Sequence, residues 1–150
     1  MMTRYMQNSA YALICLIASS WPIYCQLGDP NSTSAVRDVI ARMKRGLETE
    51  DIELYMGCFS RTRASDLEDD KPHLLSAWKK YRIYFEIVGS PQININGDTA
   101  TTQVEVEYKT TMNDGTLPLT AQMKLNLKFL QESGQWYISD AKSETAAPKK

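Results

Sequence analysis

The 150-residue chain has few of the side chains from which most metal sites and nucleophilic sites are built. It contains one histidine and three cysteines, and the cysteines show neither a C-x-x-C motif nor the number that a disulfide framework needs. Glycine-rich phosphate loops and the GxSxG motif of serine hydrolases do not occur either. The sequence therefore predicts no metal site and no cofactor.

An excess of charge of one sign is also absent. Lysine and arginine number 17 and aspartate and glutamate number 18, which gives a net charge of −1. Such a balance creates no field that would gather nucleic acid or an anionic membrane surface. The densest basic clusters lie in amphipathic patterns and are interpreted as solvated helix faces. We therefore expect no nucleic-acid partner.

A run of apolar residues long enough for a comfortable transmembrane helix is missing as well. The apolar run at 10–18 is short, with Arg4 before it and the small residues Ala18 and Ser20 after it. This is the layout of a secretory signal peptide with cleavage near Ser20. We expect export to the periplasm or the extracellular space, with no stable membrane span after cleavage. The alternative is an uncleaved segment that anchors the domain to a membrane.

Composition divides the chain into a signal peptide at 1–20, a linker at 21–33, one folded domain at 34–144 and a disordered tail at 145–150. Within the domain, Cys58 is most simply interpreted as a small buried apolar side chain. A disulfide bond between Cys25 and Cys58 in an oxidising compartment is left open.

Helical periodicity dominates the first half of the domain. Apolar residues recur at helical spacing over 35–48, after Ser34 as the predicted N-cap. A short second helix is predicted from Asp51 to Phe59, and the polar segment 61–70 is predicted to be a loop. Pro72 fits the first turn of a third helix that ends near Arg82.

The apolar period then changes from 3.6 to 2. Ile83, Phe85 and Ile87 alternate with other residues, Gly89-Ser90-Pro91 breaks the strand, and the Asn96-Gly97 turn is a strong hairpin signal. Two further strands with one apolar face follow, around 100–112 and 117–129, and a last one covers 135–141. The sequence predicts an α+β domain in which N-terminal helices pack on the apolar face of a curved antiparallel sheet.

Three sequence pieces carry a resemblance to a known superfamily. They are the Tyr55-Met56-Gly57-Cys58-Phe59-Ser60 stretch, the Ile93-x-Ile95-Asn96-Gly97-Asp98-x-Ala100 segment, and the closing Gly134-x-Trp136-x-Ile138. Together with the opening amphipathic helix they resemble the nuclear-transport-factor-2-like (NTF2-like) superfamily, also described as SnoaL-like or cystatin-like cones. The resemblance covers about 34–144 and implies a cone with a pocket at its open end. The superfamily contains isomerases, cyclases, dehydratases and accessory subunits, so the fold alone does not decide the function.

Enzymes of this superfamily place acids, histidines or tyrosines inside the cone, and no such set matches here residue by residue. Asp140 shares strand parity with Trp136 and Ile138, so it is predicted to point inward and is the one weak candidate for a catalytic acid. His73 is interpreted as a surface residue. The aromatic and sulfur side chains on apolar stripes are predicted to line the pocket or fill the core: Tyr55, Phe59, Trp78, Tyr108, Met123 and Trp136.

Three functions remain open on these residues. The first is an exported, non-enzymatic binding or accessory domain for a small apolar ligand or a partner segment. The second is a small isomerase, cyclase or dehydratase that uses an inward acid and a tyrosine. The third is an interaction subunit, for instance a homodimer, that associates through its sheet.

Overall fold

The computed structural model describes residues 30–116 and 119–145 of the chain. Four helices precede four strands: α1 (Pro30–Glu48), α2 (Ile52–Met56), α3 (Arg61–Glu68), α4 (Lys71–Trp78), β1 (Tyr81–Asn96), β2 (Thr99–Met112), β3 (Leu119–Glu132) and β4 (Gln135–Thr145). The predicted signal peptide, residues 21–29 of the predicted linker, which include Cys25, and residues 146–150 of the predicted tail lie outside the described residues. The predicted α+β class is confirmed.

The first helix is longer than the sequence predicted. It begins at Pro30, so Ser34 lies inside it and is not its N-cap. Proline suits a first helical turn because its missing N–H has no partner there in any case. The apolar stripe predicted the buried face correctly, because Val36, Val39 and Ile40 are almost fully buried.

A tight turn joins α1 to α2. Glu50 adopts a left-handed conformation with φ of 57°, and the Asp51 side chain accepts a hydrogen bond from Leu54 N at 3.0 Å. Asp51 is therefore the N-cap of α2, and the helix ends at Met56 rather than at the predicted Phe59. Gly46 of α1 lets the two helices approach closely, since a Cβ atom there would lie 2.7 Å from Tyr55 N.

The prediction of a loop at 61–70 is wrong, because Arg61–Glu68 forms α3. The segment lacks an apolar stripe, and the helix depends on other interactions. Ser60 is its N-cap and accepts a hydrogen bond from Arg63 N, while Ala64 and Leu67 pack against the core. The next helix also ends earlier than predicted, at Trp78, because the chain is already extended from Tyr81.

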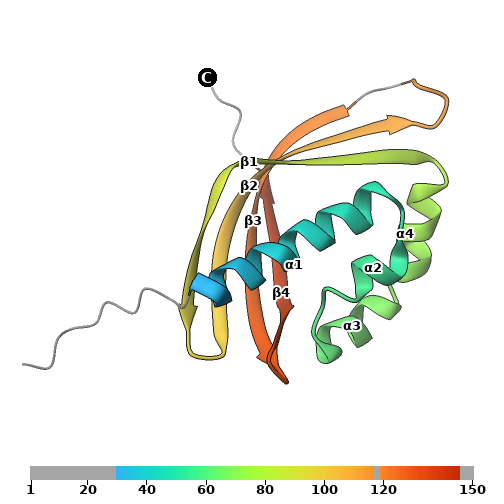
Figure 1. Ribbon diagram of the computed structural model, residues 1–150. Coiled ribbons are helices and arrows are strands. Elements are labelled where there is room, and N and C mark those ends of the chain that lie inside the picture. Colours follow the sequence, from blue (N-terminus) through green and yellow to red (C-terminus); the bar gives the residue numbers. More distant parts are fainter. Residues whose placement is uncertain (1–29, 117–118, 146–150) are drawn as a thin grey trace, which may run out of the picture.

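The four strands form one antiparallel sheet in the order β1-β2-β3-β4. Gly97, Gly115 and Gly134 adopt positive φ at the three turns, the first of which the Asn96-Gly97 hairpin signal predicted. The predicted break at 89–91 is an irregularity within one long strand, because the pairing of β1 with β2 shifts register between Val88 and Gln92. Such irregularities increase twist and curvature, and Figure 1 shows the sheet bending around α1.

The hydrophobic core lies between α1 and the concave face of the sheet (Figure 1). Val104, Leu127 and Phe129 from the central strands are almost fully buried, as the alternating pattern predicted. Leu119 belongs to the same apolar face but is 62% exposed, so the expected continuous burial of that face stops short of this end. Leu117 lies outside the described residues.

Segments from the helical half pair with both edge strands. Ser60 N donates to Ile138 O at 2.9 Å and Ile138 N donates to Cys58 O at 2.8 Å, so the segment before α3 covers the free edge of β4. On the opposite edge, Phe85 N donates to the Glu48 carboxylate at 3.1 Å. These bonds satisfy edge groups that would otherwise invite pairing with another chain.

Candidate functional site

The apolar concave face continues beyond the helices and ends in a partly exposed patch. Tyr81 is 39% exposed and lies opposite Met112, and the exposed Leu119 lies opposite Thr110. Half-buried side chains connect this end with the core. We call these residues the open-end patch: Tyr81, Tyr108, Met112, Leu119 and Met123. It offers an apolar surface at the end of the sheet that β4 does not reach, since the last described pair of β3 and β4 is Met123 with Thr145.

The six residues predicted to line a pocket divide into two groups. Phe59, Trp78 and Trp136 are buried, whereas Tyr55, Tyr108 and Met123 are half-buried. Tyr55 and Phe59 pack edge to face with ring centroids 5.1 Å apart. Tyr108 and Met123 share the concave face and the open-end patch, and Trp136 lies elsewhere, beside α1. The six therefore belong to more than one region of the domain.

Burial alters the acidity of two interior hydroxyl groups. Desolvation raises the pKa of Tyr55, the negative charge of an ionised Cys58 would add to this increase, and the positive charge of Arg63 partly opposes it. Desolvation likewise raises the pKa of Tyr108. Both hydroxyl groups are therefore protonated at neutral pH and can donate a hydrogen bond to a bound molecule.

Two buried side-chain nitrogens have no hydrogen-bond partner in the described part of the chain: Trp78 Nε1 and Arg63 Nε. Trp78 is only 4% exposed and comes three residues before Tyr81, where β1 begins. An unsatisfied buried donor is unfavourable, and ligands or ordered water commonly supply the missing acceptor. The indole N–H is thus a candidate polar contact in a mainly apolar region.

The predicted inward orientation of Asp140 is wrong. Between Lys128 and Phe129 the pairing of β3 with β4 shifts by one residue, which leaves Ser139 without a partner. The shift reverses the parity of β4, so Asp140 lies opposite Lys128 on the outer, polar face. Its carboxylate lies 3.9 Å from the Nζ atoms of both Lys128 and Lys142. It cannot act as an acid inside the cone.

The other polar candidates also lie outside the cone. His73 is exposed in the first half of α4. Glu105 and Glu107 point to the outer face, where they pair with Lys124 at 3.7 Å and with Lys109 at 2.6 Å. In the ranges 30–116 and 119–145, no group of three or more histidine, cysteine or acidic residues could hold a metal ion.

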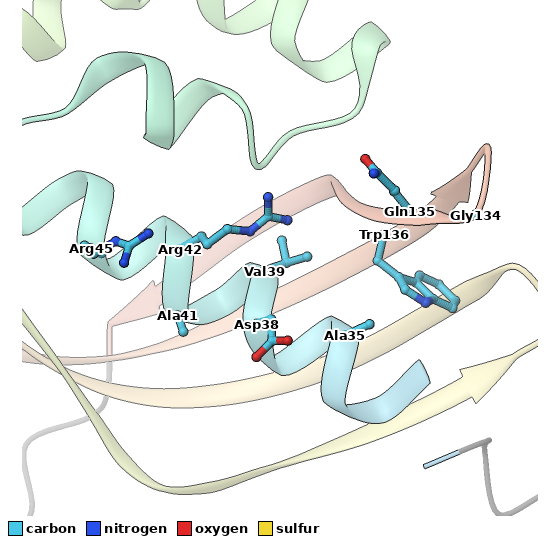
Figure 2. Close-up of a pocket in the computed structure, with 9 residues that line it drawn as sticks. All are labelled: Ala35, Asp38, Val39, Ala41, Arg42, Arg45, Gly134, Gln135 and Trp136. Atoms are coloured by element: carbon cyan, nitrogen blue, oxygen red, sulfur yellow. The ribbon is translucent and has the colours of Figure 1, made fainter. Parts of the chain in front are cut away.

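A second hollow lies between α1 and the start of β4, and we call it the α1–β4 groove. It has a volume of about 700 Å³. Its lining combines the apolar side chains of Ala35, Val39 and Trp136 with the polar ones of Arg42, Arg45 and Gln135. Figure 2 shows Arg42 extending from α1 toward the strand that carries Gln135 and Trp136.

Sequence analysis missed this groove. The two arginines were part of an amphipathic helix pattern, and nothing in the pattern indicates that the residues after Gly134 pack beside them. The free Cys58 is buried nearby, with its thiol donating to Leu54 O at 3.2 Å. Burial raises the pKa of this thiol, and the positive charge of Arg42 partly opposes the increase.

Within the residues that the structure describes, no helix is both long enough and apolar enough to cross a membrane. No protein-family model matches the sequence, and no curated protein is similar to it in sequence. Similarity is found among solved structures.

An NTF2-like superfamily protein from Salmonella enterica serovar Typhimurium aligns with 80% of this chain and 96% of its own, at 13% identity and a TM-score of 0.66. A protein with a cystatin-like fold from Caulobacter vibrioides aligns over 77% of this chain and 90% of its own, at 16% identity and a TM-score of 0.61. A type 2 hexachlorocyclohexane dehydrochlorinase aligns over 79% and 91%, at 11% identity and a TM-score of 0.61.

Proposed function

The chain has the NTF2-like fold, and from this premise we propose that it is an exported binding or accessory domain that takes a small apolar ligand or an apolar partner segment at the open-end patch. The observation that carries the proposal is the exposure of Leu119 on the same sheet face as the buried core. Covering this face with an apolar group removes apolar surface from water, which favours association.

The polar groups near the cone suit binding better than acid–base chemistry. Tyr55 and Tyr108 supply protonated hydroxyl groups, and Trp78 supplies a buried donor without a partner in the described ranges. These groups would orient an apolar ligand that carries an acceptor oxygen. The enzyme alternative loses its candidate acid, because Asp140 lies on the outer face.

Association through the outer face of the sheet receives less support. Side chains there already satisfy one another, since Gln103 Nε2 donates to Asn126 Oδ1 at 2.9 Å and Asn126 Nδ2 donates to Glu144 Oε1 at 2.9 Å. A partner on this face would first have to displace these hydrogen bonds and the neighbouring ion pairs of Glu105 and Glu107.

The binding role is tested by titrating the full chain with Nile red, a neutral apolar dye. Leu119→Ser removes the exposed apolar group from the open-end patch, and Val88→Ser is the matched control, because Val88 is 51% exposed on the outer face of β1. We expect about tenfold weaker dye binding for Leu119→Ser, from roughly 1.4 kcal/mol of lost apolar contact. The control should bind as the unsubstituted chain does. Equal affinity for both variants would refute the proposed site.

Export is tested by native mass spectrometry of the protein purified from its own host. The expected mass corresponds to a chain that begins near Trp21, carrying a small apolar molecule when purified gently. A chain that still begins at Met1 in the cytosolic fraction would refute export, and the proposal of binding at the open-end patch would be unaffected. The same spectrum reports whether the protein is a monomer or a homodimer.

A further inference from the structure

The α1–β4 groove presents two cationic side chains that no carboxylate of the described residues neutralises. Arg42 and Arg45 are exposed and form no ion pair in those ranges, whereas the neighbouring Lys44 is bound by Glu48 at 2.6 Å. The two arginines are three residues apart, so their side chains leave the same side of the helix. Both line the groove.

The remainder of the groove combines apolar residues, among them Ala35, Val39 and Trp136, with the polar Asp38 and Gln135. Val39 is 1% exposed and Trp136 is 3% exposed, so both are fixed in the core and contribute only their outer edges. Ala35 is half-buried and adds a small apolar surface one turn away from Val39.

The arrangement fits a short peptide better than a lone anion or a nucleic acid. A volume of about 700 Å³ exceeds what a single inorganic anion needs. Two guanidinium groups on a chain with a net charge of −1 give no extended basic surface for a phosphate backbone. Arginine forms paired hydrogen bonds with carboxylates, and the amide of Gln135 can bond to a peptide backbone.

We propose that the α1–β4 groove is a docking site for an acidic peptide segment of a partner protein. Its carboxylates pair with Arg42 and Arg45, and a small apolar side chain packs on the half-buried Ala35, beside the buried Val39 and Trp136 (Figure 2). Asp38 also lines the groove, one helical turn before Arg42, and repels a second acidic group at that end.

This inference is independent of the proposed function. The groove uses none of the residues of the open-end patch, so dye binding and peptide binding can each fail alone. A ligand at the patch and a partner at the groove would together describe an accessory domain with two contact surfaces.

The test begins with a phage-displayed library of random 12-residue peptides selected on the full chain. We expect the enriched peptides to contain aspartate or glutamate next to a small apolar residue. Fluorescent copies of these peptides are then titrated by anisotropy against the unsubstituted chain and the Arg42→Gln/Arg45→Gln double variant. Arg37→Gln is the matched control, because Arg37 is exposed on the same helix and does not line the groove.

The double variant should bind about tenfold more weakly, and the control should bind unchanged, because only the former loses two charge-assisted contacts. Raising the salt concentration from about 0.05 M to 0.5 M should weaken binding to the unsubstituted chain through screening. Hydrogen exchange should slow in α1 and at 134–136. The proposal is overturned if no peptide is enriched, if the double variant binds as well as the control, or if an RNA oligonucleotide displaces the peptide at lower concentration.

Discussion

Replacement of Gly46 by alanine tests how closely α1 and α2 must pack. The added Cβ atom would lie 2.7 Å from Tyr55 N, 2.9 Å from Tyr55 Cα and 3.0 Å from Tyr55 Cβ. Two of these three atoms belong to the backbone, so no change of rotamer relieves the contact. The backbone of α2 would have to move by roughly 0.8 Å to restore an ordinary separation of about 3.5 Å.

Two opposing effects decide the sign of this substitution. Alanine is the better helix former and would stabilise α1 by at most about 1 kcal/mol. Overpacking of a close contact typically costs about 1–3 kcal/mol. Because the clash is with backbone, we expect the upper part of that range and a net loss of about 1–2 kcal/mol in the free energy of unfolding. For a domain of this size the loss lowers Tm by about 4–8 °C.

The measurement is thermal and urea unfolding of the Gly46→Ala variant beside Ser34→Ala. Ser34 is exposed within α1, so that control reports the gain in helix propensity without a clash. The reasoning is refuted if Gly46→Ala is as stable as the control. A fall in Tm with unchanged dye binding would show that the movement of α2 does not reach the open-end patch.

Three further predictions concern single side chains. Glu48→Ala should lower the free energy of unfolding, measured in urea, by about 1–2 kcal/mol, because it removes the acceptor of the Phe85 N hydrogen bond and the ion-pair partner of Lys44. The control Asp38→Ala, at an exposed position of the same helix, should lower it by under about 0.5 kcal/mol. Asp140→Asn should change stability by less than about 1 kcal/mol, since both its lysine contacts lie on the solvated face, and a loss above about 2 kcal/mol would contradict that placement. Burial raises the pKa of Tyr55, so this hydroxyl ionises at lower pH in the unfolded chain than in the folded one, and the folded state loses stability as pH rises above the ordinary tyrosine value of about 10. Tyr55→Phe should therefore lose less stability than the unsubstituted chain between about pH 9 and 11. The same dependence of the free energy of unfolding on pH in both chains would argue against burial of the hydroxyl.

Local periodicity was sufficient to predict most of the fold. The apolar stripe of α1 and the alternation along β2 and β3 identify buried faces, because each depends on residues close together in the chain. The turns at Gly97, Gly115 and Gly134, which all adopt positive φ, likewise depend only on residues close together in the chain. The α+β class and the order of the four strands followed from these signals, whereas the NTF2-like fold was implied by the resemblance of three sequence pieces to that superfamily.

Features that depend on partners distant in sequence were not predictable. The helix at 61–68 has no apolar stripe and is held by the Ser60 cap and by packing on the rest of the domain, so its own residues resembled a loop. The inward orientation predicted for Asp140 failed because one unpaired residue, Ser139, reverses the parity of β4. Serine carries no signal for such an irregularity.

The sequence by itself determined which residues are apolar, at what period they recur and where the chain turns, and these properties decide the fold because burial of apolar surface dominates its free energy. Only the tertiary structure decided which surfaces remain uncovered. The helices stop short of Leu119 and leave the open-end patch exposed, and the packing of α1 beside β4 brings Arg42 and Trp136 together from positions far apart in the chain. The open-end patch arises where the packing of helices on the sheet ends, and the α1–β4 groove arises where two elements distant in the chain pack side by side.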